Sequence, residues 1–293
     1  MKLIITCIVS LVFISCEKSI DFELDELEPK IVVDASIENG LAPRVILSKS
    51  FNYFSEITPQ LLLGSFIHGA DVTISNGTKT HKLKEDSINL APGAAIYFYS
   101  VDSANVATSF VGEMNKSYLL TIKVANREYS ASTTIPALTK KLDSLWWKPS
   151  PGNPDTTKVS VITRITDPPG LGNYIRYFTS TGKGPFLPGL NSVFDDQIID
   201  GSRYDAEVER GVDRNEKIDF ENYSFFNRGD TVTVKFCNID KATFDFWRTM
   251  EYSYSSIGNP FSSPTKVLGN LQGGALGYFG GYAVQYKSLI IPR

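Results

Sequence analysis

Residues 117–135 read SYLLTIKVANREYSASTTI, and this stretch indicates the fold class. From Ser117 to Ala125 apolar side chains occupy alternate positions, as they do in a half-buried β-strand. Asn126 follows as a turn residue, and a second alternating run extends to Ile135. Two alternating runs that are separated by a turn residue are typical of a β-hairpin. We therefore predict a mainly β protein.

Similar short runs precede this hairpin. They are Lys30–Ile37, Arg44–Ser48, Asp71–Ser75, Thr78–Leu83 and Ala95–Val101. Asn76-Gly77 predicts a type I′ hairpin turn, because that turn needs positive φ at both central residues. The segment Phe51–Leu63 is aromatic and irregular, so we expect a loop there. Seven short strands in roughly 105 residues are typical of an immunoglobulin-like β-sandwich, which we assign to residues 29–136.

A proline-rich segment from Pro136 to Pro154 predicts a domain junction, because proline removes hydrogen-bond donors from a strand. Residues 137–293 then form a second β-rich domain. Its clearest strands are Lys158–Thr166, Asn173–Ser180 and Thr231–Asn238. A single helix is predicted over Asp240–Tyr254, with Asp240 as its N-cap. Its apolar stripe should dock on the sheet; the stripe consists of Phe244, Trp247, Met250 and Tyr254.

The amino terminus predicts export and lipid attachment. Lys2 is followed by an apolar run from Leu3 to Ile14, and then by Ser15 and Cys16. The run is too short to span a bilayer and has the layout of a secretory signal. A cysteine directly after the small residue is the arrangement of a bacterial lipoprotein signal. The alternative is an ordinary secretory signal with an incidental cysteine.

We therefore expect residues 1–15 to be a lipoprotein signal peptide and Cys16 to carry the lipid. Residues 16–28 follow as an acidic tether with six carboxylates and one lysine. Such a segment buries too little apolar surface to fold by itself. We expect this tether to hold the protein on the membrane through the lipid at Cys16. The acidic residues resemble a surface-export signal, but a generic spacer explains them equally well.

Composition excludes several classes of function. The formal net charge is −3, so we expect no nucleic-acid partner. The sequence has two histidines, His68 and His81, and its three cysteines include one in the signal and one at the lipid site. Neither a zinc motif nor a G-x-S-x-G elbow is present. Catalytic residues are therefore not assigned, and we expect a protein that is not an enzyme.

One acidic loop is the candidate metal site. It contains Asp195, Asp196, Asp200 and Asp205 around Gly201. Calcium takes six to eight oxygen ligands from flexible carboxylate loops, so these residue types suit it. The spacing does not match an EF-hand, and a solvated loop without an ion is the alternative.

Several motifs resemble a known family. They are Cys16-Glu17-Lys18, Pro29–Ile37, Val45–Ser50, Gly69–Ile74, Lys116–Leu120, Asp167-Pro168-Pro169-Gly170, Asn259-Pro260-Phe261, Val267–Asn270 and Gly274–Gly280. Together they resemble the domain-of-unknown-function 4249 family of Bacteroidota lipoproteins. The resemblance implies an outer-membrane lipoprotein, often encoded beside TonB-dependent receptors, and no known reaction. Which side of the outer membrane it faces stays open, with the cell surface favoured.

Two functions follow as expectations. The first is a non-enzymatic accessory or ligand-binding partner of a TonB-dependent receptor. Its preferred contacts are Phe51, Tyr53 and Phe54, because aromatic side chains on loops suit recognition. The same side chains could instead cover the edge of the sandwich core. The second function is a surface hydrolase of glycans or peptides that uses the acidic loop.

Overall fold

The structure is a computed structural model that describes residues 28–51, 55–150, 153–257, 259, 261–263 and 265–293. It confirms the mainly β class with one long helix. The strands in the first half are β1 (Ile31–Glu38), β2 (Arg44–Lys49), β3 (Asp71–Ser75), β4 (Thr80–Ala91), β5 (Ala94–Val101), β6 (Lys116–Val124) and β7 (Arg127–Ile135). Those in the second half are β8 (Lys141–Pro149), β9 (Lys158–Thr166), β10 (Tyr174–Thr181), β11 (Leu187–Phe194), β12 (Arg203–Val208), β13 (Phe226–Asn227), β14 (Thr231–Ile239) and β15 (Leu276–Ile290). The helices are α2 (Pro59–Leu63) and α3 (Lys241–Ser255).

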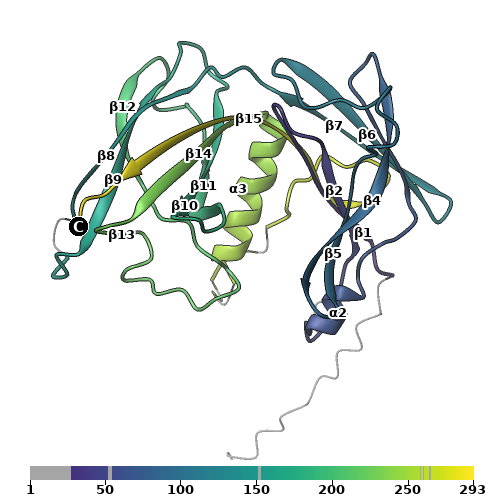
Figure 1. The fold of residues 1–293 in the computed structure, drawn as a ribbon, viewed down its shortest axis with the longest axis horizontal. Helices are drawn as coiled ribbons and strands as arrows, with labels where there is room; N and C mark the ends of the chain where they lie inside the picture. Colours follow the sequence, from purple (N-terminus) through teal and green to yellow (C-terminus); the bar gives the residue numbers. More distant parts are fainter. Residues whose placement is uncertain (1–27, 52–54, 151–152, 258, 260, 264) are drawn as a thin grey trace, which may run out of the picture.

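The last strand joins the two halves. An 11-stranded sheet has the order β11-β10-β14-β15-β1-β2-β5-β4-β3-β6-β7. The first part of β15 pairs in parallel with β1, from Val32↔Leu276 to Glu38↔Tyr282. The second part pairs antiparallel with β14, from Ile239↔Tyr282 to Thr231↔Ile290. In Figure 1, β15 runs across the molecule from one half to the other.

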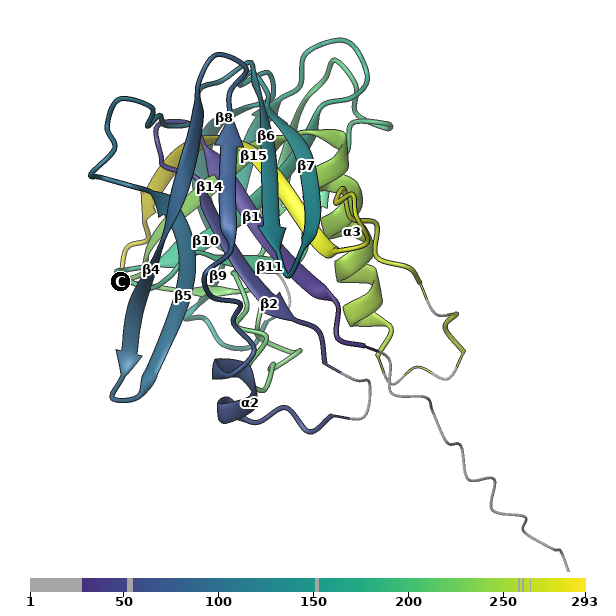
Figure 2. The ribbon, with the colours of Figure 1, turned by 90° about the vertical axis from the view of Figure 1, so that its right-hand side faces the viewer.

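The first half encloses its own core. Strand β4 pairs with β3 through residues 80–82 and with β5 through residues 83–91, so it carries the sheet from one layer into the other. Figure 2 shows β6 and β7 in front of β1 and β15. The alternation predicted for β1 is confirmed, because Val33, Ala35 and Ile37 are buried in this core. Phe279 and Ala283 of β15 contribute to the same core.

The second half has a core on each face of β14. Val232, Val234 and Phe236 point toward a smaller sheet, in which β9 pairs with β8, β12 and β13. Cys237 and Ile239 belong to the core under α3 on the opposite face. This arrangement docks α3 on the large sheet. Phe244, Trp247 and Met250 of the predicted stripe contact the core, whereas Tyr254 is 38% exposed. Asp240 is the N-cap of α3, as predicted.

Two turns differ from the sequence prediction. Asn76-Gly77 does not form a type I′ turn, because Gly77 has positive φ and Asn76 does not. Instead the Asn76 side chain accepts hydrogen bonds from the backbone N–H groups of Thr78 and Lys79. Consecutive positive φ values occur at Ala125 (50°) and Asn126 (58°), in the hairpin from which the fold class was predicted.

The loop predicted at Phe51–Leu63 and the proline-rich segment predicted as a domain junction both contain regular elements. The excursion from residue 51 to 63 contains α2, which begins with Thr58 as N-cap and Pro59 in its first turn. The proline-rich segment contains β8, which pairs along β9. The division between residues 136 and 137 stays a prediction. Strand β15 contributes to both halves, so a boundary there would not separate their sheets.

Candidate functional site

The structure separates the four aspartates of the predicted calcium loop. Asp205, on β12, forms a bidentate ion pair with Arg164 of β9, with N···O distances of 2.7 and 2.9 Å. Asp195 pairs with Arg248 of α3 at 3.3 Å. Both carboxylates therefore have partners of their own, and the predicted set of four is not one cluster.

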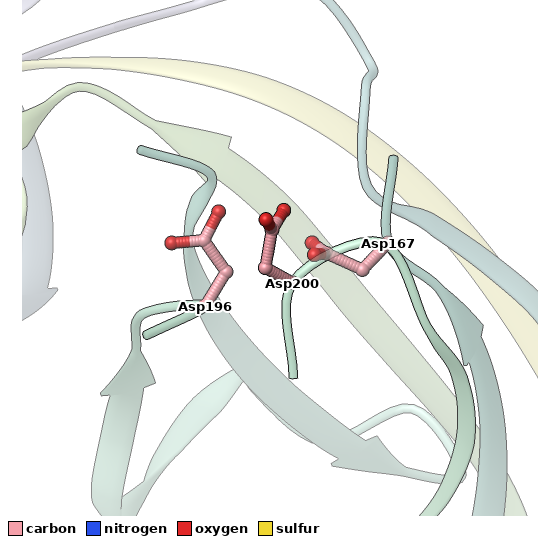
Figure 3. A group of neighbouring side chains, drawn as sticks. All are labelled: Asp167, Asp196 and Asp200. Atoms are coloured by element: carbon pink, nitrogen blue, oxygen red, sulfur yellow. The ribbon is translucent and has the colours of Figure 1, made fainter. Parts of the chain in front are cut away.

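Asp196 and Asp200 do lie together, and Asp167 joins them. Carboxylate oxygens of the three residues, the acidic cluster, lie within 4.8 Å of one another. Figure 3 shows Asp167 approaching from the segment after β9 and the other two from the loop after β11. Sequence reasoning missed Asp167 as a member, although it belongs to the Asp-Pro-Pro-Gly motif that carried the family resemblance. The missing information was the proximity of two loops about 30 residues apart.

Most oxygens of the acidic cluster bind backbone N–H groups. Asp196 accepts hydrogen bonds from the N–H groups of Gly172 (3.1 Å) and Asn173 (2.9 Å). Asp200 accepts one from Gly170 at 2.7 Å, and Asp167 accepts one from Gly201 at 3.1 Å. The carboxylates thus tie the two loops together.

These hydrogen bonds also set the charge state of Asp196. Burial by itself would raise the pKa of this carboxyl group, but the N–H donors of Asn173 and Gly172 outweigh it, and the pKa lies below its ordinary value. Asp196 is therefore ionised at neutral pH.

A buried lysine already supplies a cation to the acidic cluster. Lys140 Nζ lies 3.1 Å from Asp167 Oδ1, and both side chains are fully buried. The backbone of Lys140 is fixed by the side chains of Asn238 (2.9 Å) and Gln285 (3.0 Å). A buried pair of this kind is costly to break, because the remaining charge would be left uncompensated. The residue types fit calcium, but Lys140 would compete with it for Asp167, and calcium stays a prediction.

The two histidines lie in the first half, and both have partners there. His68 Nδ1 contacts Glu85. His81 is fully buried, with Thr108 Oγ1 at 2.9 Å from Nδ1 and the Asp102 N–H donating to Nε2 at 2.9 Å. Burial lowers the pKa of His81, against the opposing charge of Asp102. Cys237 is buried, and burial raises its pKa to about 12, so its thiolate is scarce at neutral pH.

Exposed apolar side chains gather at one end of the first half. We call this surface the apolar end. It is formed by α2, by residue 57 just before α2, and by residues 88–90 of β4. Its members are Ile57 (61% exposed), Leu61 (37%), Leu62 (47%), Ile88 (48%) and Leu90 (63%). In Figures 1 and 2 it lies at the bottom of the molecule, where the chain enters β1.

The predicted contact residues lie in the sequence next to this end. Phe51 is half-buried. Tyr53, Phe54 and the predicted lipidation site Cys16 fall outside the described residues. In the part of the chain that is described, no helix has the length and apolar character needed to cross a membrane.

Comparison with known families gives one match. The model of the family described as Domain of unknown function (DUF4249) matches residues 17–288, which is nearly the whole chain. The chain belongs to this family. No curated protein sequence matches it. The DUF4249 match confirms the resemblance found in the opening and closing motifs, which pair with one another as β1 and β15.

Proposed function

We propose that this DUF4249 protein is a non-enzymatic, lipid-anchored outer-membrane lipoprotein that serves as the accessory or ligand-binding partner of a TonB-dependent receptor. The observation that carries the proposal is the apolar end, which lies where the chain leaves for the predicted lipid site. Lipid attachment at Cys16 and a receptor partner follow from the signal motif and the family resemblance.

The tether keeps the apolar end near the membrane. Glu28 lies twelve positions after Cys16, so the reach of a fully extended tether is about 40 Å. A neighbouring receptor barrel would lie within that distance. Apolar side chains that gather on a soluble surface are typical of protein interaction sites. The apolar end has five large apolar side chains that are at least one-third exposed.

The polar groups of the chain support binding over catalysis. Both histidines are held by partners in the first half, and the one cysteine outside the signal and lipid site is buried. The hydrolase remains as the alternative because the acidic cluster brings three carboxylates together. Most of those oxygens bind backbone N–H groups or Lys140, which leaves little of the cluster free for general acid and base chemistry.

The test is affinity capture of the tagged, lipidated protein from detergent-solubilised outer membrane of its native host. Wild type should retain a TonB-dependent receptor. The paired variants Leu61→Asp/Leu62→Asp and Ile88→Asp/Leu90→Asp should each lose it, because buried carboxylates are costly at an interface. Ile198→Asp is the matched control, since Ile198 is 96% exposed and lies in the second half.

Two results would contradict the proposal. In the first, the wild-type protein captures no receptor barrel and hydrolyses glycan or peptide substrates, and Asp200→Asn abolishes that hydrolysis. The other is equal capture of the receptor by wild type and by both apolar-end variants. Labelled palmitate should be incorporated into the wild type but not into Cys16→Ala. Incorporation into that variant would contradict lipid attachment at Cys16.

A further inference from the structure

A cleft lies between β1 and α3. Figure 1 shows these two elements facing one another. The cleft has two adjoining compartments, of about 570 and 660 Å³, which share Asp34, Trp247 and Tyr278. We call it the central cleft. Residues of β1 with even numbers line it from one compartment to the other, while the odd-numbered residues fill the core behind the strand.

The first compartment contains an arginine held between two aromatic rings. The guanidinium of Arg176 lies 3.4 Å from the ring centre of Trp247 and 4.6 Å from that of Phe178. Its Nε donates to Ser192 Oγ at 3.2 Å, and Nη1 makes a long contact of 3.5 Å with the Tyr282 hydroxyl. Arg176 is 4% exposed, so its charge is largely removed from water.

Arg176 lacks an anionic partner among the residues that the structure describes. No carboxylate oxygen there lies within 4.0 Å of it. The other inner cations of this compartment have partners: Lys235 pairs with Glu38, and Arg214 lies 3.9 Å from Glu251. A buried guanidinium without an anion is costly, and an anion that enters from the cleft would compensate it.

Two charged side chains flank that position. Arg44 is exposed at the rim and can add a second cation. Asp34 faces the junction of the two compartments. Desolvation by the walls of the cleft raises the pKa of Asp34, although Arg44, Tyr278 and Arg176 each act to lower it, and the side chain still reaches solvent. The carboxylate of Asp34 would repel a ligand anion, so the anion should lie on the arginine side.

The second compartment is mainly apolar. Beyond Trp247 and Tyr278, its walls come from β1, α3 and the segment before and into β15. The apolar side chains are those of Val32, Phe246, Met250, Val267, Leu271 and Leu276. A ligand that extends from the arginines into this compartment would therefore need an apolar body.

We propose that the central cleft binds a carboxylate-bearing amphiphile, with its carboxylate at Arg176 and Arg44 and its hydrocarbon part along Val32, Met250 and Leu276. This inference does not depend on the receptor partner. Charge-assisted hydrogen bonds to a desolvated guanidinium should supply much of the selectivity for the head group.

Isothermal titration calorimetry with decanoate below its micellar concentration tests the inference on the full mature chain. Wild type should bind decanoate more tightly than decanol or acetate. Arg176→Gln and Arg44→Gln should weaken decanoate binding, the former by roughly tenfold or more. Leu276→Asp should also weaken it. Asp34→Asn should tighten binding several-fold, because a like charge is removed. Arg248→Gln, on α3 but outside the cleft, should leave it unchanged.

Some of these variants should weaken decanoate binding and Asp34→Asn should tighten it. Opposite effects of this kind distinguish a ligand site from general damage to the fold. If Arg176→Gln does not fold, Arg44→Gln and Asp34→Asn still decide, since Arg44 and Asp34 are exposed. Absence of decanoate binding, equal binding of decanol, or weaker binding by Asp34→Asn would overturn the inference. Equal binding of acetate would show an anion site without an apolar compartment and would overturn the amphiphile as ligand.

Discussion

At the scale of single residues, Gly277 shows why the closing motif contains glycine. It has φ of +100°, and a Cβ atom there would lie 1.9 Å from the carbonyl oxygen of Val33. At Gly277 the backbones of β15 and β1 approach one another too closely for a side chain. Glycine inside a strand is typical of such a close backbone approach.

Gly277→Ala should therefore destabilise the protein by about 2–4 kcal/mol, from the steric clash and the positive φ together. Gly40→Ala is the matched control. Gly40 also has positive φ (79°), but a Cβ there meets no atom within 4 Å, so it should cost about 1 kcal/mol. Urea unfolding measures both. Equal losses would show that backbone strain, and not the contact with Val33, explains the effect.

At the scale of elements, Asp240 links α3 to the first half. One oxygen accepts the N-cap hydrogen bond from the Thr243 N–H at 2.8 Å. The other accepts from Thr133 Oγ1 at 2.8 Å and from the Thr134 N–H at 3.0 Å, both on β7. The capping role was predictable from the local sequence, whereas the contact with β7 joins residues more than 100 positions apart.

Asp240→Ala should lower the free energy of unfolding by about 2–4 kcal/mol, because it removes the cap and leaves buried donors on β7 without an acceptor. Asp240→Asn should cost less, since its amide oxygen can still cap the helix. Thermal unfolding followed by circular dichroism measures the relative stability of the wild type and the two variants. A loss for Asp240→Asn equal to that for Asp240→Ala would mean that the cap contributes little.

The elements that sequence reasoning found are those with regular alternation and local turns. Strands β1, β6 and β7 have this pattern, and α3 has helical spacing behind a capping aspartate. Strand β8 was missed because prolines surround it, and β15 was not located because its glycines interrupt the alternation. The acidic cluster and the central cleft needed contacts between distant segments, which no local pattern contains.

At the scale of the whole molecule, β15 couples the two halves, since it completes the core of the first half and the large sheet of the second. We expect the halves to unfold together. Hydrogen exchange measured by mass spectrometry across a urea series should show peptides from β6–β7 and from β9–β10 losing protection at the same midpoint. Separate midpoints would support two independent domains and contradict this coupling.

The pairing of β1 with β15 also fixes the order in which the protein can be completed. Residue 34 meets its neighbour Tyr278 after more than 240 intervening residues have been made. A chain that leaves the ribosome from its amino terminus must therefore hold β1 without one of its two partners until residues 276–282 have been made. We therefore expect the sheet that joins the two halves to close late in folding, since its closure depends on a contact between distant parts of the chain.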